Sequence, residues 1–150
     1  MKYIITESQH RRLFEEEQKV LRIPDFKIFG KDWDALQRFL ESKGNPPYSL
    51  GGNLDLVGLK VESLGNLVSV EHDLYAYDTP LKSLGSLTSV GGLMDLSNTQ
   101  IESLGNLSFV GGSLVLNGIP LFGEDTSPRS LERQSDIIRR KVYVKGNILY

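Results

Sequence analysis

Residues 51–70 read GGNLDLVGLKVESLGNLVSV, and the next forty residues repeat this pattern twice. The second copy is EHDLYAYDTPLKSLGSLTSV (71–90), the third is GGLMDLSNTQIESLGNLSFV (91–110), and GGSLVLNGIPLFG (111–123) begins a fourth. The motif SLGNL or SLGSL recurs at 63, 83 and 103 without an insertion. An uninterrupted period of this length is typical of repeat proteins, in which each repeat buries its apolar side chains against its neighbours.

Apolar residues occupy the same six positions in successive repeats. Two of these positions are separated by a single residue, as in Leu54 and Leu56, and this alternation predicts a strand that turns every second side chain inward. One repeat alone cannot bury six apolar positions, so we expect the repeats to stack in register. The columns are Leu54, Leu74, Met94 and Leu114; Leu56, Ala76, Leu96 and Leu116; Val61, Leu81, Ile101 and Leu121; Leu64, Leu84 and Leu104; Leu67, Leu87 and Leu107; and Val70, Val90 and Val110.

Turn-forming residues recur between the apolar positions. Gly, Asp or Asn stands at 58, 78, 98 and 118, Gly at 65, 85 and 105, and a Gly-Gly pair begins at 51, 91 and 111. These residues accept positive φ or tight turns, so each repeat has three bends and no room for a helix. The prediction is an α+β repeat protein: a short right-handed parallel β solenoid of about four to five coils, spaced about 4.8 Å apart, with helical N- and C-terminal caps.

The pattern GGxLxLxxTxIxSLGNLxSV resembles the short leucine-rich-repeat-like coils of phage and bacterial proteins. It is also similar to the repeats of receptor L domains, in which an SxGGxLxI segment precedes the strand. The resemblance covers residues 49–121 and departs from the standard leucine-rich repeat at the inward asparagine, where Thr79 and Thr99 stand. It implies a recognition role, usually of proteins, without catalytic residues, and it is compatible with a phage-encoded protein directed at a host protein.

The N-terminal segment is expected to cover one open end of the stack, which would otherwise expose apolar columns and strand edges. The capping box TESQ (6–9) starts a predicted helix to about Val20. A second helix is predicted from near Asp32 to Gly44, with its apolar residues on one stripe. Residues 1–50 therefore form a helical cap in this interpretation.

The C-terminal segment is expected to cover the other end. Ser127 suits a helix N-cap and is followed by proline, so a helix is predicted over 128–141. The final residues restore the start of a repeat, since Ile148 matches Leu114. The chain is thus interpreted as a single domain over 1–150. Its parts are the cap, the repeats (51–121), and a C-terminal helix with a terminal strand (122–150).

Composition narrows the class of protein. The chain has 150 residues, about one domain, and its net charge of −2 and pI near 5.7 give no basic surface of the kind that binds nucleic acid. It has no cysteine, which favours a reducing compartment, and no run of roughly 18 apolar residues that would span a bilayer. We expect a cytoplasmic protein, in the host cytoplasm if phage-encoded, with a protein partner, no nucleic acid, no membrane, and a monomeric state favoured.

The sequence carries no recognisable catalytic or metal-binding motif. His10 and His72 are the only histidines, and GxSxG, HExxH, a P-loop lysine and a cysteine nucleophile are all missing. Asp55 and Asp95 would lie two repeats apart, about 10 Å, a separation like that of inverting glycosidase carboxyls. Nothing in the sequence indicates a cleft around them. We therefore expect no enzymatic activity, no cofactor, and no catalytic or metal-binding residues.

The second repeat differs from its neighbours on the outward side of its strand. Tyr75 and Tyr77 stand where the other repeats carry Asp and small or aliphatic residues. Tyrosines flanked by acidic residues are common interface anchors. We expect a protein-binding surface anchored by these two tyrosines, and the residues around them are His72, Asp73, Asp55, Asp95, Leu93 and Val115.

Other interpretations stay open at this point. The small Ala76 leaves room for a cap side chain such as Trp33, or an N-terminal helix covers the same face, in which case the tyrosines are structural. The alternative functions are a virion or assembly component whose repeats stack by symmetry, and a glycan-binding solenoid with the tyrosines as sugar-stacking platforms.

Overall fold

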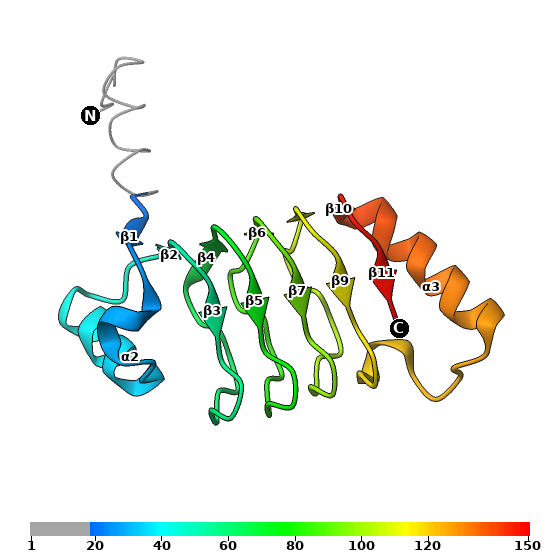
Figure 1. The fold of residues 1–150 in the computed structure, drawn as a ribbon, viewed down its shortest axis with the longest axis horizontal. Helices are drawn as coiled ribbons and strands as arrows, with labels where there is room; N and C mark the ends of the chain where they lie inside the picture. Colours follow the sequence, from blue (N-terminus) through cyan, green and yellow to red (C-terminus); the bar gives the residue numbers. More distant parts are fainter. Residues whose placement is uncertain (1–18) are drawn as a thin grey trace, which may run out of the picture.

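A computed structural model of the chain describes residues 19–150 (Figure 1). Within these residues the strands form two parallel sheets, and the α-helices lie at opposite ends of the row of repeats. The chain has a repeat-like α+β fold, which confirms the predicted fold class. The helix expected from Thr6 lies outside the described residues, apart from Lys19 and Val20, which are not helical.

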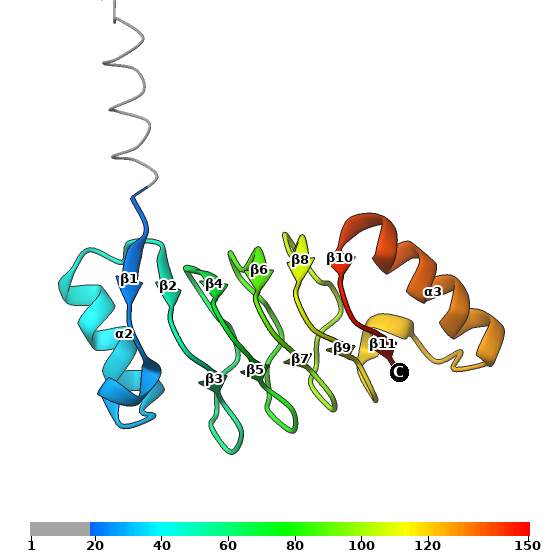
Figure 2. The same cartoon turned by 45° about the horizontal axis from the view of Figure 1, so that its top comes forward.

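Each full repeat contributes one strand to each sheet (Figure 2). The six-stranded sheet runs in the order β1 (Leu21–Ile23), β2 (Tyr48–Leu50), β4 (Leu67–Val70), β6 (Ser89–Val90), β8 (Phe109–Val110) and β10 (Tyr143–Val144). The five-stranded sheet runs in the order β11 (Ile148–Leu149), β9 (Leu114–Val115), β7 (Met94–Asp95), β5 (Leu74–Tyr75) and β3 (Leu54–Asp55).

The strand register follows the sequence period. Leu54 pairs with Leu74, Leu74 with Met94, and Met94 with Leu114, each twenty positions on. The same spacing relates Ser69 to Ser89 and Ser89 to Phe109 in the other sheet. The prediction that equivalent residues stack in columns is confirmed.

The apolar columns form one buried cluster between the two sheets. Leu54, Leu74, Met94 and Leu114 are fully buried, and Val70, Val90 and Val110 enter the same cluster from the six-stranded sheet. The columns weaken at the C-terminal end, where Leu104 and Leu121 are only partly buried. The fourth repeat breaks after Leu121, so no further repeat packs over these two side chains.

The turn residues have two different physical roles. Asp78 (φ 55°) and Asn98 (φ 56°) adopt the left-handed backbone that was predicted at their positions. At Gly91 and Gly111, by contrast, the backbone is not left-handed, and glycine is needed because the preceding repeat lies too close for a side chain. A Cβ at Gly91 would collide with the carbonyl oxygen of Glu71.

The N-terminal cap contains more strand than predicted. The helix α2 (Trp33–Ser42) begins where expected, and its N-cap Asp32 accepts a hydrogen bond from the Ala35 amide at 3.1 Å. The strand β1 and the 3₁₀ helix η1 (Phe26–Phe29) were not anticipated. Because β1 pairs with β2, and β2 with β4, the cap extends the six-stranded sheet as well as covering its end.

The C-terminal cap follows the prediction closely. The helix α3 (Pro128–Lys141) has Ser127 as its N-cap, and a short 3₁₀ helix, η2 (Pro120–Phe122), ends the last repeat. Ile148 pairs with Leu114, so the terminal strand restores the repeat register. Val144 and Ile148 are buried, which joins β10 and β11 to the core.

Candidate partner-binding surface

The predicted site residues come together on the outer face of the five-stranded sheet. Asp55 pairs with Tyr75, Tyr75 with Asp95, and Asp95 with Val115, so these four form one row across adjacent strands. Their inward neighbours, such as Leu74 and Ala76, are fully buried, and the row therefore points away from the core. We call this surface the tyrosine face; its residues are Asp55, Asp73, Tyr75, Tyr77, Leu93, Asp95 and Val115.

Tyr75 is held in place by Asp73. The Tyr75 hydroxyl donates to Asp73 Oδ2 at 2.9 Å, and Asp73 Oδ1 accepts from the Leu93 amide at 2.8 Å. The hydrogen bond to the Asp73 carboxylate raises the pKa of Tyr75, and desolvation and the nearby charges of Asp73 and Asp55 act in the same direction. Tyr75 therefore presents a positioned, protonated phenol.

Tyr77 is the more accessible of the two tyrosines. It is 37% exposed, whereas Tyr75 is partly buried in the middle of the row. Leu93 and Val115, which were predicted to be members of this surface, are both partly buried. Val115 lies on β9, between β7 and β11, and Leu93 directly precedes β7. The exposed apolar area of the tyrosine face therefore comes more from the tyrosine rings than from Leu93 and Val115.

The carboxylates of Asp55 and Asp95 have structural partners. Asp95 Oδ1 accepts from the Ser97 amide at 2.9 Å and from its hydroxyl at 2.6 Å, while Asp55 Oδ1 accepts from the Val57 amide at 3.1 Å. These hydrogen bonds stabilise the turn that follows each strand. Tyr75 lies between the two carboxylates in the register, so they are separated by two strand spacings, as predicted.

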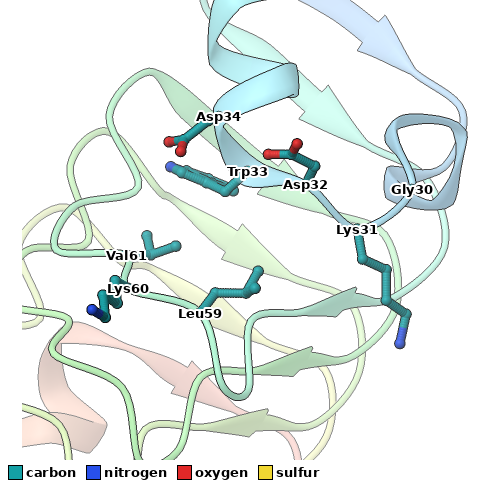
Figure 3. Close-up of a pocket in the computed structure, with 8 residues that line it drawn as sticks. All are labelled: Gly30, Lys31, Asp32, Trp33, Asp34, Leu59, Lys60 and Val61. Atoms are coloured by element: carbon teal, nitrogen blue, oxygen red, sulfur yellow. The ribbon is translucent and has the colours of Figure 1, made fainter.

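Lys31 reaches the tyrosine face from the N-terminal cap, which the sequence did not reveal. Its Nζ lies 3.2 Å from Asp55 Oδ2. Lys31 has a φ of 58°, and a left-handed backbone costs an ordinary residue about 1–2 kcal/mol. This turn sends its side chain away from Trp33 (Figure 3). The cap therefore neutralises one acidic end of the row.

Glu71 and His72 replace a glycine pair and have separate surroundings. Glu71 Oε1 accepts from Arg22 Nη2 at 2.8 Å and from Arg22 Nε at 3.1 Å, which ties the second repeat to β1. His72 is exposed beside β5, and its amide donates to the Gly52 carbonyl at 3.2 Å. Glu71 thus has a structural explanation, while His72 stays a candidate member of the surface.

Trp33 does not explain the small residue at position 76. Its ring meets Phe26 edge-on, with ring centroids 6.1 Å apart. It also lines a pocket of about 320 Å³ opposite Leu59 and Val61 of the first repeat (Figure 3). These contacts belong to the cap and the first repeat, whereas Ala76 is in the second.

Two pockets lie where a cap meets the repeats, whereas another, of about 390 Å³, lies within the repeats beside Lys82, Gln100 and Pro120. The pocket beside Trp33 lies between α2 and the first repeat. A second, of about 240 Å³, lies between α3 and the third repeat and is lined by Leu104, Leu107 and Ile138. Leu59, which lines the first of these pockets, is partly buried, whereas Thr79 and Thr99 at the same position in later repeats are buried.

No group of three or more histidine, acidic or cysteine side chains within residues 19–150 is arranged to hold a metal ion. The helices of that same part of the chain are too short or too polar to cross a membrane. No family model matches the chain, and no curated protein or solved structure is significantly similar to it.

Proposed function

We propose that the chain is a non-enzymatic protein-binding module and that it binds its partner through the tyrosine face. The observation that carries the proposal is the register of the five-stranded sheet. It sets Tyr75 between two aspartates, and the exposed Tyr77 lies in the turn directly after the same strand.

We further propose that the repeats are the coils of a short right-handed parallel β solenoid of leucine-rich-repeat-like kind. The twenty-residue register and the shared apolar columns support this interpretation. Thr79 and Thr99 stand at the position of the family's asparagine. Each hydroxyl donates to a carbonyl three residues earlier in its own repeat, at 2.6 and 2.7 Å respectively. The side-chain ladder between coils is therefore replaced by bonds within each coil.

The geometry of Tyr75 favours binding because its side chain loses little conformational entropy when a partner docks. Its phenol is already oriented by Asp73, and a tyrosine ring has few rotatable bonds. Tyr77 supplies accessible apolar area beside it. Acidic side chains surround both rings and supply the polar rim that interfaces commonly have.

The test uses matched variants on the two outer faces of the molecule. The double variant Tyr75→Ala, Tyr77→Ala removes both anchors, and Tyr143→Ala removes a tyrosine that is 64% exposed on the six-stranded sheet. Wild type and both variants are immobilised and exposed to a nuclease-treated host lysate. The proposal expects a protein that binds wild type and Tyr143→Ala but is lost from the double variant.

Two results would contradict the proposal. One is a partner retained by the double variant, which would place the binding surface elsewhere. The other is a large loss of thermal stability in the double variant, which would make the tyrosines structural. Tyr75→Phe separates ring from hydroxyl: it keeps the ring but loses the bond to Asp73, so we expect weaker binding than wild type and stronger binding than Tyr75→Ala.

A further inference from the structure

A second aromatic site lies on the outer face of the six-stranded sheet, away from the tyrosine face. Phe109 of β8 and Tyr143 of β10 are register partners. Their rings stack with centroids 5.8 Å apart and planes inclined by 10°. They are 37% and 64% exposed, so the pair is a stacked aromatic platform open to solvent.

Tyr143 occupies the last position of a row in which Phe109 follows two serines. Ser69 pairs with Ser89, Ser89 with Phe109, and Phe109 with Tyr143. One face of the Tyr143 ring meets Phe109. Among the strands of residues 19–150, β10 is at the edge of this sheet, so none of them lies beyond the other face. A planar group from a ligand could continue the stack there.

Positively charged residues flank Tyr143 in the sequence. The segment 139–145 contains Arg139, Arg140, Lys141 and Lys145 and no acidic residue, and all four cations are exposed. Arg139 Nη1 donates to the Val144 carbonyl at 3.4 Å, which holds one guanidinium at β10. None of the ion pairs found within residues 19–150 involves these four side chains.

The rest of the molecule has the opposite charge. The repeats (51–121) contain two lysines, no arginine and seven acidic residues. The overall charge of −2 therefore conceals a separation between acidic repeats and a basic C-terminal cap. The prediction that nucleic acid is not a partner used only the charge of the whole chain, and local charge decides where an anion binds.

We propose that this surface, formed by Phe109, Tyr143, Arg139, Arg140 and Lys145, binds a short segment of single-stranded nucleic acid. A base stacks on the free face of Tyr143, and the adjacent phosphates meet the cations. Unpaired bases are required, because a base inside a duplex has no face available to a side chain. The acidic repeats limit the footprint to a few nucleotides.

The experiment measures fluorescence anisotropy of a labelled oligothymidylate of about eight nucleotides titrated with the full chain. Tyr143→Leu should weaken binding by about fivefold to 150-fold, the range that one stacked base supplies. Tyr143→Phe keeps the ring and should bind like wild type. Tyr77→Leu changes the tyrosine face instead and should also bind the oligothymidylate like wild type. A failure of this proposal can therefore be told apart from a failure of the proposed protein-binding function.

The phosphate contacts are tested by salt. With three such contacts, the logarithm of the affinity should fall with the logarithm of salt concentration with a slope of about −2. Arg140→Gln combined with Lys145→Gln should make this slope shallower while Tyr143 remains. Circular dichroism of each variant checks that the fold is retained.

Four results would overturn the proposal: no binding of the oligothymidylate at low salt, equal binding by Tyr143→Leu, tighter binding of a matched duplex, or equal binding of a polyglutamate peptide. If polyglutamate binds equally well and its binding is unchanged in Tyr143→Leu, the surface binds acidic protein segments instead.

Discussion

Two leucines at the same position of successive repeats should differ in their contribution to stability. Leu84 and Leu104 both follow the serine of the SLGSL or SLGNL motif. Leu84 is 2% exposed between its neighbours in the stack, whereas Leu104 is partly buried beside the pocket under α3. Sequence alone treats them as equivalent.

The magnitudes follow from burial and cavity formation. Truncating a fully buried leucine to alanine costs about 2.7–5 kcal/mol, because the lost transfer free energy is joined by the cavity left behind. We expect about 3 kcal/mol or more for Leu84→Ala, and the same for Leu64→Ala, since Leu64 is fully buried. Leu104→Ala should cost only about 1–2 kcal/mol, because part of that side chain already faces solvent and an existing pocket.

Urea unfolding followed by circular dichroism gives these free energies, provided that the m-values agree. In thermal melts, Leu84→Ala should lower Tm by about 6–12 °C, since each kcal/mol corresponds to about 2–4 °C in a domain of this size. Equal losses at the two leucines, or a larger loss at Leu104, would refute the proposed difference in packing.

Three further outcomes are expected. Deleting residues 143–150 removes β10, β11 and the buried Val144 and Ile148, and should cost about 3–6 kcal/mol in chemical denaturation; an unchanged midpoint would mean that these strands are not part of the core. Glu71→Gln should lower stability by at most about 1 kcal/mol, and by less in high salt, because its partner Arg22 is 61% exposed; a larger, salt-independent loss would contradict this. Tyr75 should ionise above the ordinary tyrosine pKa of about 10 in an ultraviolet titration, and Asp73→Asn should bring its pKa back down. Since the folded state holds this proton more tightly, the resulting stabilisation is present below pH of about 10 and is lost as the pH rises through the pKa of the folded state. An unchanged Tyr75 pKa in Asp73→Asn would disprove the stated cause.

The repeat region was predictable because its signal recurs. Leu54 and its equivalents report the same environment several times, so the column, the strand and the register follow together. The helix α3 was also predictable, because Ser127 and Pro128 mark its start at the point where the repeat breaks. These features depend on local patterns of residues that can be read directly from one sequence.

The remaining features depend on contacts that do not recur. The three residues of β1 carry no repeat, and their strand exists only because β2 offers a partner. The reason for glycine at position 91 was wrong in part, since close approach of Glu71, not positive φ, requires it. The Lys31–Asp55 ion pair joins residues that no sequence pattern connects.

One missed feature had a usable signal. The alignment that matches Ile148 with Leu114 also matches Tyr143 with Phe109, which would have indicated the stacked pair. Exposure of both rings could not be deduced in this way, because it depends on how the C-terminal segment packs against the repeats.

Engineered disulfides test the register of the repeats most directly, because the natural chain has no cysteine. Ser69 and Ser89 are register partners, so their Cα atoms lie about 4.8 Å apart, within the range that a disulfide spans. Ser49 and Ser89 are two strands apart, about 10 Å, which is too far for a disulfide. We predict that the variant Ser69→Cys, Ser89→Cys closes an intramolecular disulfide under mild oxidation and that Ser49→Cys, Ser89→Cys does not. Closure of the second pair as readily as the first would contradict the stacking of repeats in register.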